Sequence, residues 1–260
     1  MKSKLAGALF FILSIGVFIL PYMVLEPPDT SATNRYKSWW LPEVSSTYGP
    51  GIDMLFNVIL WVTIVVFVLV TIALLYFLWK YRAQGKKATY THGNNKLEIA
   101  WTAIPAVILV FLAIFSNDLW SEIRYPSNFP KNADIIRIKP RQFQWDITYP
   151  GADKKFDTPD DINTINQLYL VKGEPSQILL QAQDVIHSFF VPEFRIKQDA
   201  VPGMSTSVWI TPTVDTKPEF PYEIACAELC GLGHYRMKGF VTVTSRDSVN
   251  SFLLSQMESQ

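Results

Sequence analysis

Three long runs without a charged residue set the strongest constraint on how this chain can fold. They cover residues 5–25, 54–79 and 99–117 of the 260-residue sequence. Each run is close to the ~20 residues that a helix needs to cross a bilayer. The second and third runs are bounded by charged residues, and a buried helix of a soluble protein is the less favoured alternative. They therefore predict a transmembrane helical hairpin within residues 54–120.

The first run, within residues 1–25, admits two interpretations. Lys2 and Lys4 precede its apolar stretch, a pattern that a membrane segment shares with a cleaved signal peptide. No cysteine follows it, which excludes a lipoprotein anchor. Residues 26–53 are then expected to form an extracytoplasmic linker to the hairpin.

The loop between the second and third runs, residues 80–98, is strongly basic. Its five lysine and arginine residues face a single acidic residue, Glu98. Loops rich in lysine and arginine remain on the cytoplasmic side of a membrane. We therefore expect this loop inside the cytoplasm and residues 121–260 outside it.

The outer portion, residues 121–260, carries short apolar runs separated by proline, glycine, asparagine and aspartate. This spacing predicts a β-sandwich or barrel with antiparallel strands rather than βαβ units. A length of about 140 residues is sufficient for one such core. Within it, residues 151–166 are dense in aspartate, lysine and proline and predict an exposed loop. The expected fold class is a membrane-anchored all-β protein.

The overall composition limits the kinds of partner. Hydrophobic residues make up 49% of the chain, and 23 basic residues balance 23 acidic ones. A chain without net positive charge gives no indication of a nucleic-acid partner. The expected surroundings of the apolar runs are membrane lipid.

Both cysteines of the chain lie in one short stretch, residues 226–237. Cys226 and Cys230 are followed there by His234 and Met237. Thiolate and thioether are soft donors, and together with imidazole they favour copper over magnesium, calcium or manganese. Glycines within the stretch allow the backbone to turn tightly, so that side chains close in sequence can converge. The stretch therefore predicts a metal-binding loop.

Other uses of this cluster are less favoured. A disulfide is the usual fate of a cysteine pair outside the cytoplasm, but it would leave the nearby histidine and methionine unused. Zinc has little use for a thioether, and covalent haem attachment requires Cys-x-x-Cys-His, which is absent. A mononuclear blue-copper site uses one cysteine. Two bridging thiolates that hold two copper ions use every donor.

The stretch Cys226-Ala-Glu-Leu-Cys230-Gly-Leu-Gly-His234-Tyr-Arg-Met237 resembles the binuclear copper (CuA) signature of cytochrome c oxidase subunit II. Residues 184–192 and 197–203 are similar to the segment that supplies the first histidine ligand in that family. The resemblance implies a cupredoxin-like Greek-key β-barrel or sandwich and a centre of two copper ions. The implied ligands are His187, Cys226, the backbone carbonyl of Glu228, Cys230, His234 and Met237.

The same resemblance implies a role in respiration. Subunit II accepts electrons from cytochrome c and passes them to a haem of subunit I, where oxygen is reduced to water and protons are pumped. This chain would be one subunit of that oxidoreductase, with subunits I and III as partners, and would not reduce oxygen alone. The expected location is a bacterial inner membrane, with the copper domain on the periplasmic side. The alternatives are a membrane-anchored copper chaperone, which would not need Met237 or Glu228, and a quinol-oxidase subunit, which lacks the copper ligands.

Two carboxylates acquire further roles from the resemblance. Glu98 lies in residues 97–105, which are similar to the start of the family's second helix, where a carboxylate marks the entrance of a proton pathway. A carboxylate favoured by the dipole of a helix N-terminus is the alternative. The carboxylate of Glu228 is expected to help hold a Mg²⁺ ion at the boundary with subunit I.

Electron entry is predicted from residues 142–145. They resemble the family's Gln-Trp-x-Trp strand but read Gln-Phe-Gln-Trp, so that Phe143 replaces the tryptophan that receives the electron. On a strand, Phe143 and Trp145 would share one face. The candidate acids that would attract a basic cytochrome are Asp153, Asp157, Asp160 and Asp161.

Overall fold

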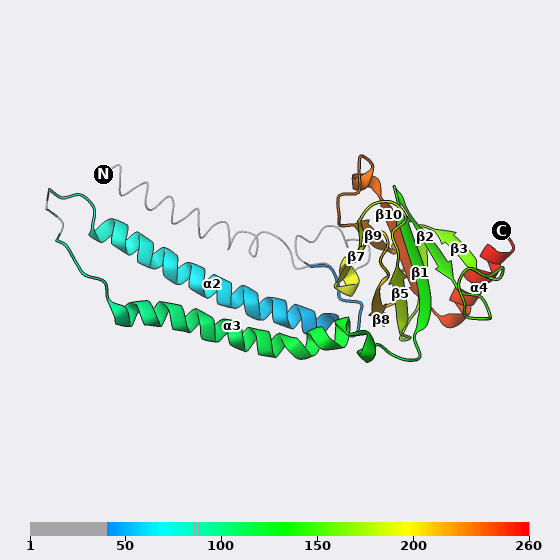
Figure 1. The fold of residues 1–260 in the computed structure, drawn as a ribbon, viewed down its shortest axis with the longest axis horizontal. Helices are drawn as coiled ribbons and strands as arrows, with labels where there is room; N and C mark the ends of the chain where they lie inside the picture. The colour runs from blue at the N-terminus through cyan, green and yellow to red at the C-terminus, as the bar shows by residue number, and fades with distance from the viewer. Residues whose placement is uncertain (1–40, 86, 88, 260) are drawn as a thin grey trace. The chain divides into compact units, whose positions relative to one another are not determined.

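The structure is a computed structural model that describes residues 41–85, 87 and 89–259 (Figure 1). The described residues form two units. One unit holds residues 53–120, and the other combines residues 41–52 with residues 121–259. The predicted segment within residues 1–25 lies outside the described part of the chain, as does most of the linker.

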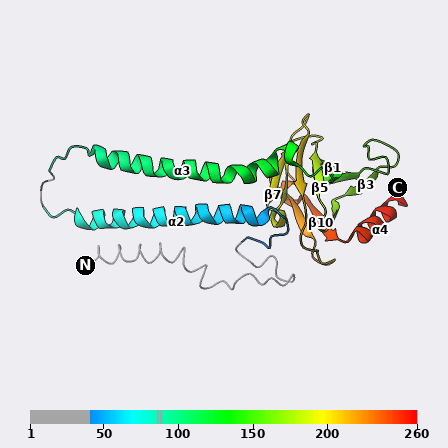
Figure 2. The same ribbon diagram turned by 90° about the horizontal axis from the view of Figure 1, so that it is seen from below.

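The first unit consists of most of helices α2 (Gly49–Lys80) and α3 (Asn95–Arg124), which run in opposite directions (Figure 2). Both are long and apolar enough to cross a membrane, by length and composition. Most of their apolar side chains are exposed, as suits contact with lipid. The side chain of Asn94 accepts the backbone N–H groups of Lys96 and Leu97, so it caps the start of α3. The predicted helical hairpin is confirmed.

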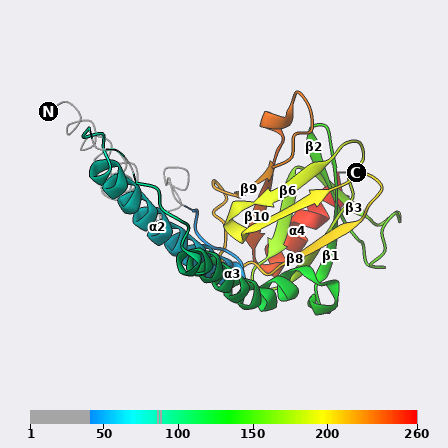
Figure 3. The same cartoon turned by 60° about the vertical axis from the view of Figure 1, so that its left-hand side comes forward.

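The second unit is a sandwich of two five-stranded sheets. In order across the first sheet, the strands are β3 (Ile162–Ile165), β2 (Gln144–Tyr149), β1 (Asp134–Arg141), β5 (Ser176–Leu180) and β8 (Thr206–Ile210). The second sheet contains β4 (Gln167–Val171), β10 (Lys238–Thr244), β9 (Tyr222–Cys226), β6 (His187–Val191) and β7 (Ile196–Ala200) (Figure 3).

The sheets are not wholly antiparallel, which corrects the prediction. β1 pairs with β5 in parallel, and β10 pairs with β4 in parallel. Each parallel pair joins strands that are separated in sequence by crossings between the sheets, whereas the turn signals read from the sequence identify only local hairpins. The core between the sheets is apolar, because alternate residues such as Ile138, Leu180 and Val241 are fully buried.

Short elements complete the unit. The 3-10 turns among its described residues are η2 (Pro126–Asn128), η3 (Pro192–Phe194) and η4 (His234–Arg236). A helix that the sequence patterns did not indicate, α4 (Arg246–Met257), contacts β3 and β4. Its Phe252 stacks on Tyr169 with ring centroids 3.7 Å apart, and its Arg246 forms ion pairs with Asp134 and Glu174.

Residues 41–49, here called the strap, are part of the β-unit rather than of a free linker. Ser45 is fully buried, its backbone N–H donates to Glu193 O at 2.8 Å, and its carbonyl accepts from Thr213 N at 3.1 Å. The hydroxyl of Tyr48 donates to Trp209 O at 3.0 Å. The β-unit therefore includes residues from the N-terminal side of α2, which the sequence patterns assigned to a linker.

We expect Ser45→Ala to destabilise the β-unit by about 1 kcal/mol, because the buried hydroxyl of Tyr222 would lose its 2.8 Å partner, Ser45 Oγ. Ser127→Ala is the matched control, since Ser127 is exposed and bonds only its neighbour Asn128 among the contacts described. The measurement is the thermal unfolding midpoint of the full chain in detergent. Equal midpoints for the two variants would show that the strap does not stabilise the unit through this bond.

Candidate metal centre

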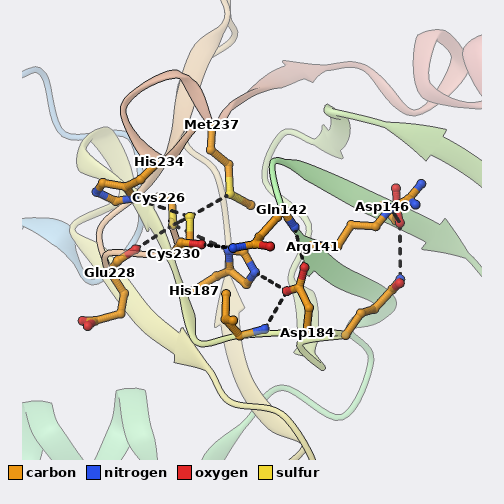
Figure 4. A network of polar contacts seen from close by, with 12 residues as sticks. Arg141, Gln142, Asp146, Asp184, His187, Cys226, Glu228, Cys230, His234 and Met237 are labelled. Atoms are coloured by element: carbon orange, nitrogen blue, oxygen red, sulfur yellow. Dashed lines mark hydrogen bonds and ion pairs between the residues drawn. The ribbon is translucent and has the colours of Figure 1, made fainter. Parts of the chain in front are cut away.

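The predicted ligands come from two strands and the loop that follows one of them. His187 begins β6, and Cys226 ends β9. The two strands are paired with Phe189 opposite Cys226, which places the start of one beside the end of the other. The loop from β9 to β10 carries the remaining donors, as Figure 4 shows.

The structure brings all six predicted donors into one connected group. Cys226 Sγ lies 3.8 Å from Cys230 Sγ, 3.8 Å from His187 Nδ1 and 3.2 Å from the carbonyl oxygen of Glu228. Cys230 Sγ lies 3.6 Å from His234 Nδ1 and 3.7 Å from Met237 Sδ. The carboxylate of Glu228 points away from the sulfur atoms, whereas its carbonyl faces them (Figure 4).

This donor set fits copper. Both cysteines are free, and their 3.8 Å separation is far beyond a disulfide bond. Ligand atoms of His187, Cys226 and Cys230 all lie within 4.8 Å of one another. Two thiols, two imidazoles and a thioether form a soft site that suits copper and does not suit hard cations.

The centre is largely shielded from water. His187, Cys230 and Met237 are buried. The indole of Trp145 lies under the site, with its ring centroid 6.4 Å from that of His187 and 5.9 Å from that of Phe189. Such apolar surroundings restrict solvent access to a metal and thereby influence its potential.

Asp184 orients His187, the first of the predicted ligands. Its Oδ1 lies 2.8 Å from His187 Nε2, so that Nδ1 is the ring nitrogen that faces the sulfur atoms. A metal-binding histidine commonly gives its other ring N–H to a carboxylate in this way. Asp184 lies in the segment that resembled the family, but no role was predicted for it. Its spacing of three residues from His187 is the signal that could have found it.

The metal-free site favours one thiolate. Burial opposes ionisation of Cys226, but hydrogen bonds with His187 and with the backbone of Ser188 and Glu228 outweigh it and lower the pKa to about 6. Burial raises the pKa of Cys230 to about 12, and the charge on Cys226 contributes to this rise. A metal ion must therefore displace the proton of Cys230 when it binds. Burial lowers the pKa of His187, but its bonds to Cys226 and Asp184 raise it above its ordinary value overall.

Phe143 lies in the turn between β1 and β2 and not on a strand, which corrects the predicted strand geometry. Its half-buried ring covers the backbone of the cysteine loop: a Cβ at Gly233 would come within 2.5 Å of Phe143 Cδ2. Trp145 is on β2 and is fully buried in the core. The two aromatic residues therefore occupy different environments, with only Phe143 reaching the surface beside the ligands.

The four candidate docking aspartates lie on the loop from β2 to β3, at the other end of β2 from Phe143. The length of β2 alone separates these ends by about 17 Å. Asp157 forms a bidentate pair with the buried Arg137 at 2.8 Å, and Asp161 lies 3.9 Å from the same guanidinium. These hydrogen bonds with Arg137 lower the pKa of Asp157. The loop acids therefore lie apart from the ring of Phe143, and sequence alone could not reveal this separation.

The proton-entry candidate, Glu98, belongs to the other unit. It lies in the first turn of α3 and is exposed. This position agrees both with a pathway entrance and with a carboxylate at a helix N-terminus.

Models of known families match two parts of the chain. The transmembrane domain of cytochrome C oxidase subunit II matches residues 33–119, and the periplasmic domain of that subunit matches residues 138–245. The alternative cytochrome c oxidase subunit 2 of Bradyrhizobium diazoefficiens is 31% identical over 246 residues, which cover 85% of each chain. Cytochrome c oxidase subunit 2 of Thermostichus vulcanus is 29% identical over 256 residues, covering 78% of this chain and 74% of that one.

Among solved structures, the periplasmic domain of subunit II of cytochrome oxidase from Bradyrhizobium japonicum matches with a TM-score of 0.42 and 23% identity. The match covers 50% of this chain and 97% of that one.

A cupredoxin-like sandwich that gathers thiol, imidazole and thioether donors at one end, joined to two apolar helices, defines a membrane-anchored copper protein. The chain belongs to the cytochrome c oxidase subunit II family. Copper binding and electron transport follow from this membership. The β-unit corresponds to the family's periplasmic domain.

We expect Gly233→Ala to destabilise the β-unit by about 1–3 kcal/mol, because its new methyl group would overlap the ring of Phe143. Phe143→Ala should remove the overlap, so that the double variant is more stable than the two single effects predict. The measurement is again the thermal unfolding midpoint of the full chain. If the changes in stability of the two single variants simply add in the double variant, the new methyl group does not collide with the ring.

Proposed function

We propose that this chain is the copper-bearing subunit of a haem-copper terminal oxidase. In this role its β-unit holds two copper ions, receives single electrons from cytochrome c and delivers them to a haem of subunit I. The observation that carries the proposal is the convergence of six donors, including two free thiols 3.8 Å apart, at one buried end of the sandwich. Two thiolates at this separation are available to bridge a pair of metal ions.

The protein contributes a fixed, dry environment for electron transfer. Bound copper supplies the one-electron redox chemistry. Asp184 keeps Nδ1 of His187 directed at the sulfur atoms, and Trp145 packs beneath the imidazole. Since the donors are held by strands and by hydrogen bonds, they need to move little when the charge of the site changes. Because the ligands rearrange little, electron transfer into the site and out of it is fast.

A copper chaperone uses the same donor types and remains the second candidate. A chaperone must release its ion, whereas here Cys230 and Met237 are buried and His187 is fixed by a carboxylate. These features favour retention of copper. The quinol-oxidase alternative lacks the ligands that are present here.

The test is the copper content and electron spin resonance pattern of the full chain purified in detergent. We expect two coppers per chain and a mixed-valence pattern, and we expect Cys226→Ser and Cys230→Ser each to abolish that pattern. Met237→Leu should shift the potential more than it lowers copper content, because the thioether is one donor among several. Met204→Leu is the control, since Met204 is an exposed methionine outside the donor set.

One copper per chain with a mononuclear blue-copper pattern would contradict the two-copper assignment. Copper that passes readily to an apo acceptor protein would favour the chaperone.

Electron entry at Phe143 is part of the proposal. The half-buried ring lies over Gly231 and Gly233 of the cysteine loop, so a donor that contacts the ring is close to the ligands. We expect Phe143→Ala to slow electron transfer within the docked complex, while Phe143→Tyr, which keeps an aromatic ring, should retain it. Stopped-flow oxidation of reduced cytochrome c measures this, with the copper spectrum as the check on the site. Wild-type rates for the alanine variant would place electron entry elsewhere.

The same measurements at increasing ionic strength examine the aspartate loop. Attraction by Asp153, Asp157, Asp160 and Asp161 over a distance would make association fall as salt rises. Trp145, buried under His187, is proposed to belong to the path between the surface and the copper ions.

The remaining proposed roles concern the neighbouring subunits. The carboxylate of Glu228 is exposed and points away from the sulfur atoms, so it is available to a Mg²⁺ ion that prefers oxygen donors. Glu98 is proposed to take up protons at the cytoplasmic end of α3. Subunits I and III and a bacterial inner membrane complete the proposed setting.

A further inference from the structure

Gln142 lies outside the donor set but bonds directly to the cysteine loop. Its side-chain Nε2 donates to the carbonyl oxygen of Cys230 at 2.5 Å (Figure 4). The residue belongs to the turn between β1 and β2, a different part of the sandwich from the strands that carry the ligands. This hydrogen bond therefore ties the middle of the metal-binding loop to the opposite sheet.

The same residue also bonds to the histidine side of the site. The backbone N–H of Gln142 donates to Asp184 Oδ2 at 2.7 Å, and Asp184 Oδ1 lies 2.8 Å from His187 Nε2. One residue thus contacts both the carboxylate that orients a histidine ligand and the carbonyl of a cysteine ligand. The two ligand-bearing segments are connected through Gln142 in addition to the pairing of β6 with β9.

The cysteine loop has few other bonds to the rest of the unit. In the described part of the chain, Ala227 N donates to Ser188 O at 3.0 Å beside the end of β9. The remaining backbone hydrogen bonds of the loop are local, such as His234 N to Gly231 O and Met237 N to His234 O. Apart from the Ala227 bond, the hydrogen bond described between this loop and another segment is the one that the Gln142 amide donates from the opposite sheet.

Gly231 makes this approach possible. Its φ of +129° is one that residues with a side chain rarely adopt, and a Cβ there would lie 2.6 Å from Gln142 Nε2. The loop backbone passes directly beneath the amide and the neighbouring ring of Phe143. Gly231, the first glycine of the Gly-x-Gly pair, thus leaves the space that the side chain of Gln142 on the facing turn occupies.

We propose that Gln142 is a positioning residue that locks the cysteine loop against the histidine segment and so sets the geometry of the copper ligands. The inference rests on the proposed copper function of the site, but the lock itself is a property of the metal-free chain. Its amide N–H is the essential group, because a carbonyl can accept only from a donor. Residues that support metal ligands from outside the donor set typically change metal affinity by about 10- to 100-fold when replaced.

Two substitutions separate the hydrogen bond from the volume of the side chain. Gln142→Met keeps the length and removes the donor, and Gln142→Glu keeps the shape but places a carboxylate against a carbonyl. Gln142 is exposed, so neither change should prevent folding. Gln144→Met is the matched control: it replaces the same residue type in the same hairpin, where the amide bonds Asp146 instead of the loop.

The first measurement uses the full metal-free chain in detergent and a thiol reagent. Every chain compared here also carries Cys226→Ser, so that Cys230 is the cysteine that is labelled. Cys230 is buried, so it should react slowly while Gln142 is unchanged. We expect Gln142→Met and Gln142→Glu to accelerate labelling of Cys230 by about 10-fold or more, while Gln144→Met leaves the rate unchanged. Equal labelling rates in all four chains would overturn the proposal, whatever the metal content of the site.

The second measurement uses the copper-loaded chain with both cysteines present. Competition with a copper chelator should show about 10- to 100-fold weaker retention in the Gln142 variants, together with an altered hyperfine pattern in the electron spin resonance spectrum. In a double-mutant cycle, Asp184→Ala should reduce the effect of Gln142→Met, because the turn would already be released from the histidine segment. Additive effects would overturn the connection between the two segments.

Failure of the wild-type chain to show a two-copper spectrum would count against the proposed function alone. The labelling result on metal-free protein would still decide whether Gln142 locks the loop.

Discussion

The copper site depends on the register between β6 and β9. Phe189 is opposite Cys226, and His187 is two residues from Phe189 on the same face of its strand. Both side chains are buried against Trp145. A slip of one residue would turn His187 and Phe189 to the other face of the sheet and separate the imidazole from the thiols. The packing of Trp145 and Phe189 therefore secures the register that the metal ligands require.

A rigid site close to the surface also needs support from outside the ligand set. Hydrogen bonds from Asp184 and Gln142 supply it on the side of the first sheet. The strap supports the other end of β6, because Ser45 bonds Glu193 in the turn that follows this strand. Support thus comes from Asp184, three residues before its partner His187, and from two segments that are remote in sequence, the turn at Gln142 and the strap. This arrangement explains why the structural unit of the copper domain extends beyond residues 121–260 to include residues N-terminal to α2.

The sequence predicted best those features that depend on residues close to one another in the chain. Soft donors within residues 226–237 predicted the metal, and charge-free runs predicted the two helices, because both signals need only short-range patterns. The parallel strand pairs, the strap and α4 were not predicted, since each depends on contacts between distant segments. Docking at the aspartate loop stays a prediction, and the pairing of Asp157 with the buried Arg137, twenty residues away in sequence, is a feature that composition alone could not show. Asp184 and Gln142 lay within quoted motifs, yet only the fold shows that they meet.

The exposed tip of the cysteine loop adds a last constraint on how the site is used. Leu229, Leu232 and Tyr235 are 78, 97 and 81% exposed, although they flank buried ligands. Two charged residues of the same loop, Glu228 and Arg236, are exposed beside them. Apolar groups gathered on one loop mark a surface that binds another protein. A loop that Gln142 bonds from within and that exposes apolar side chains on its outer side is suited to the proposed transfer of electrons across a protein interface.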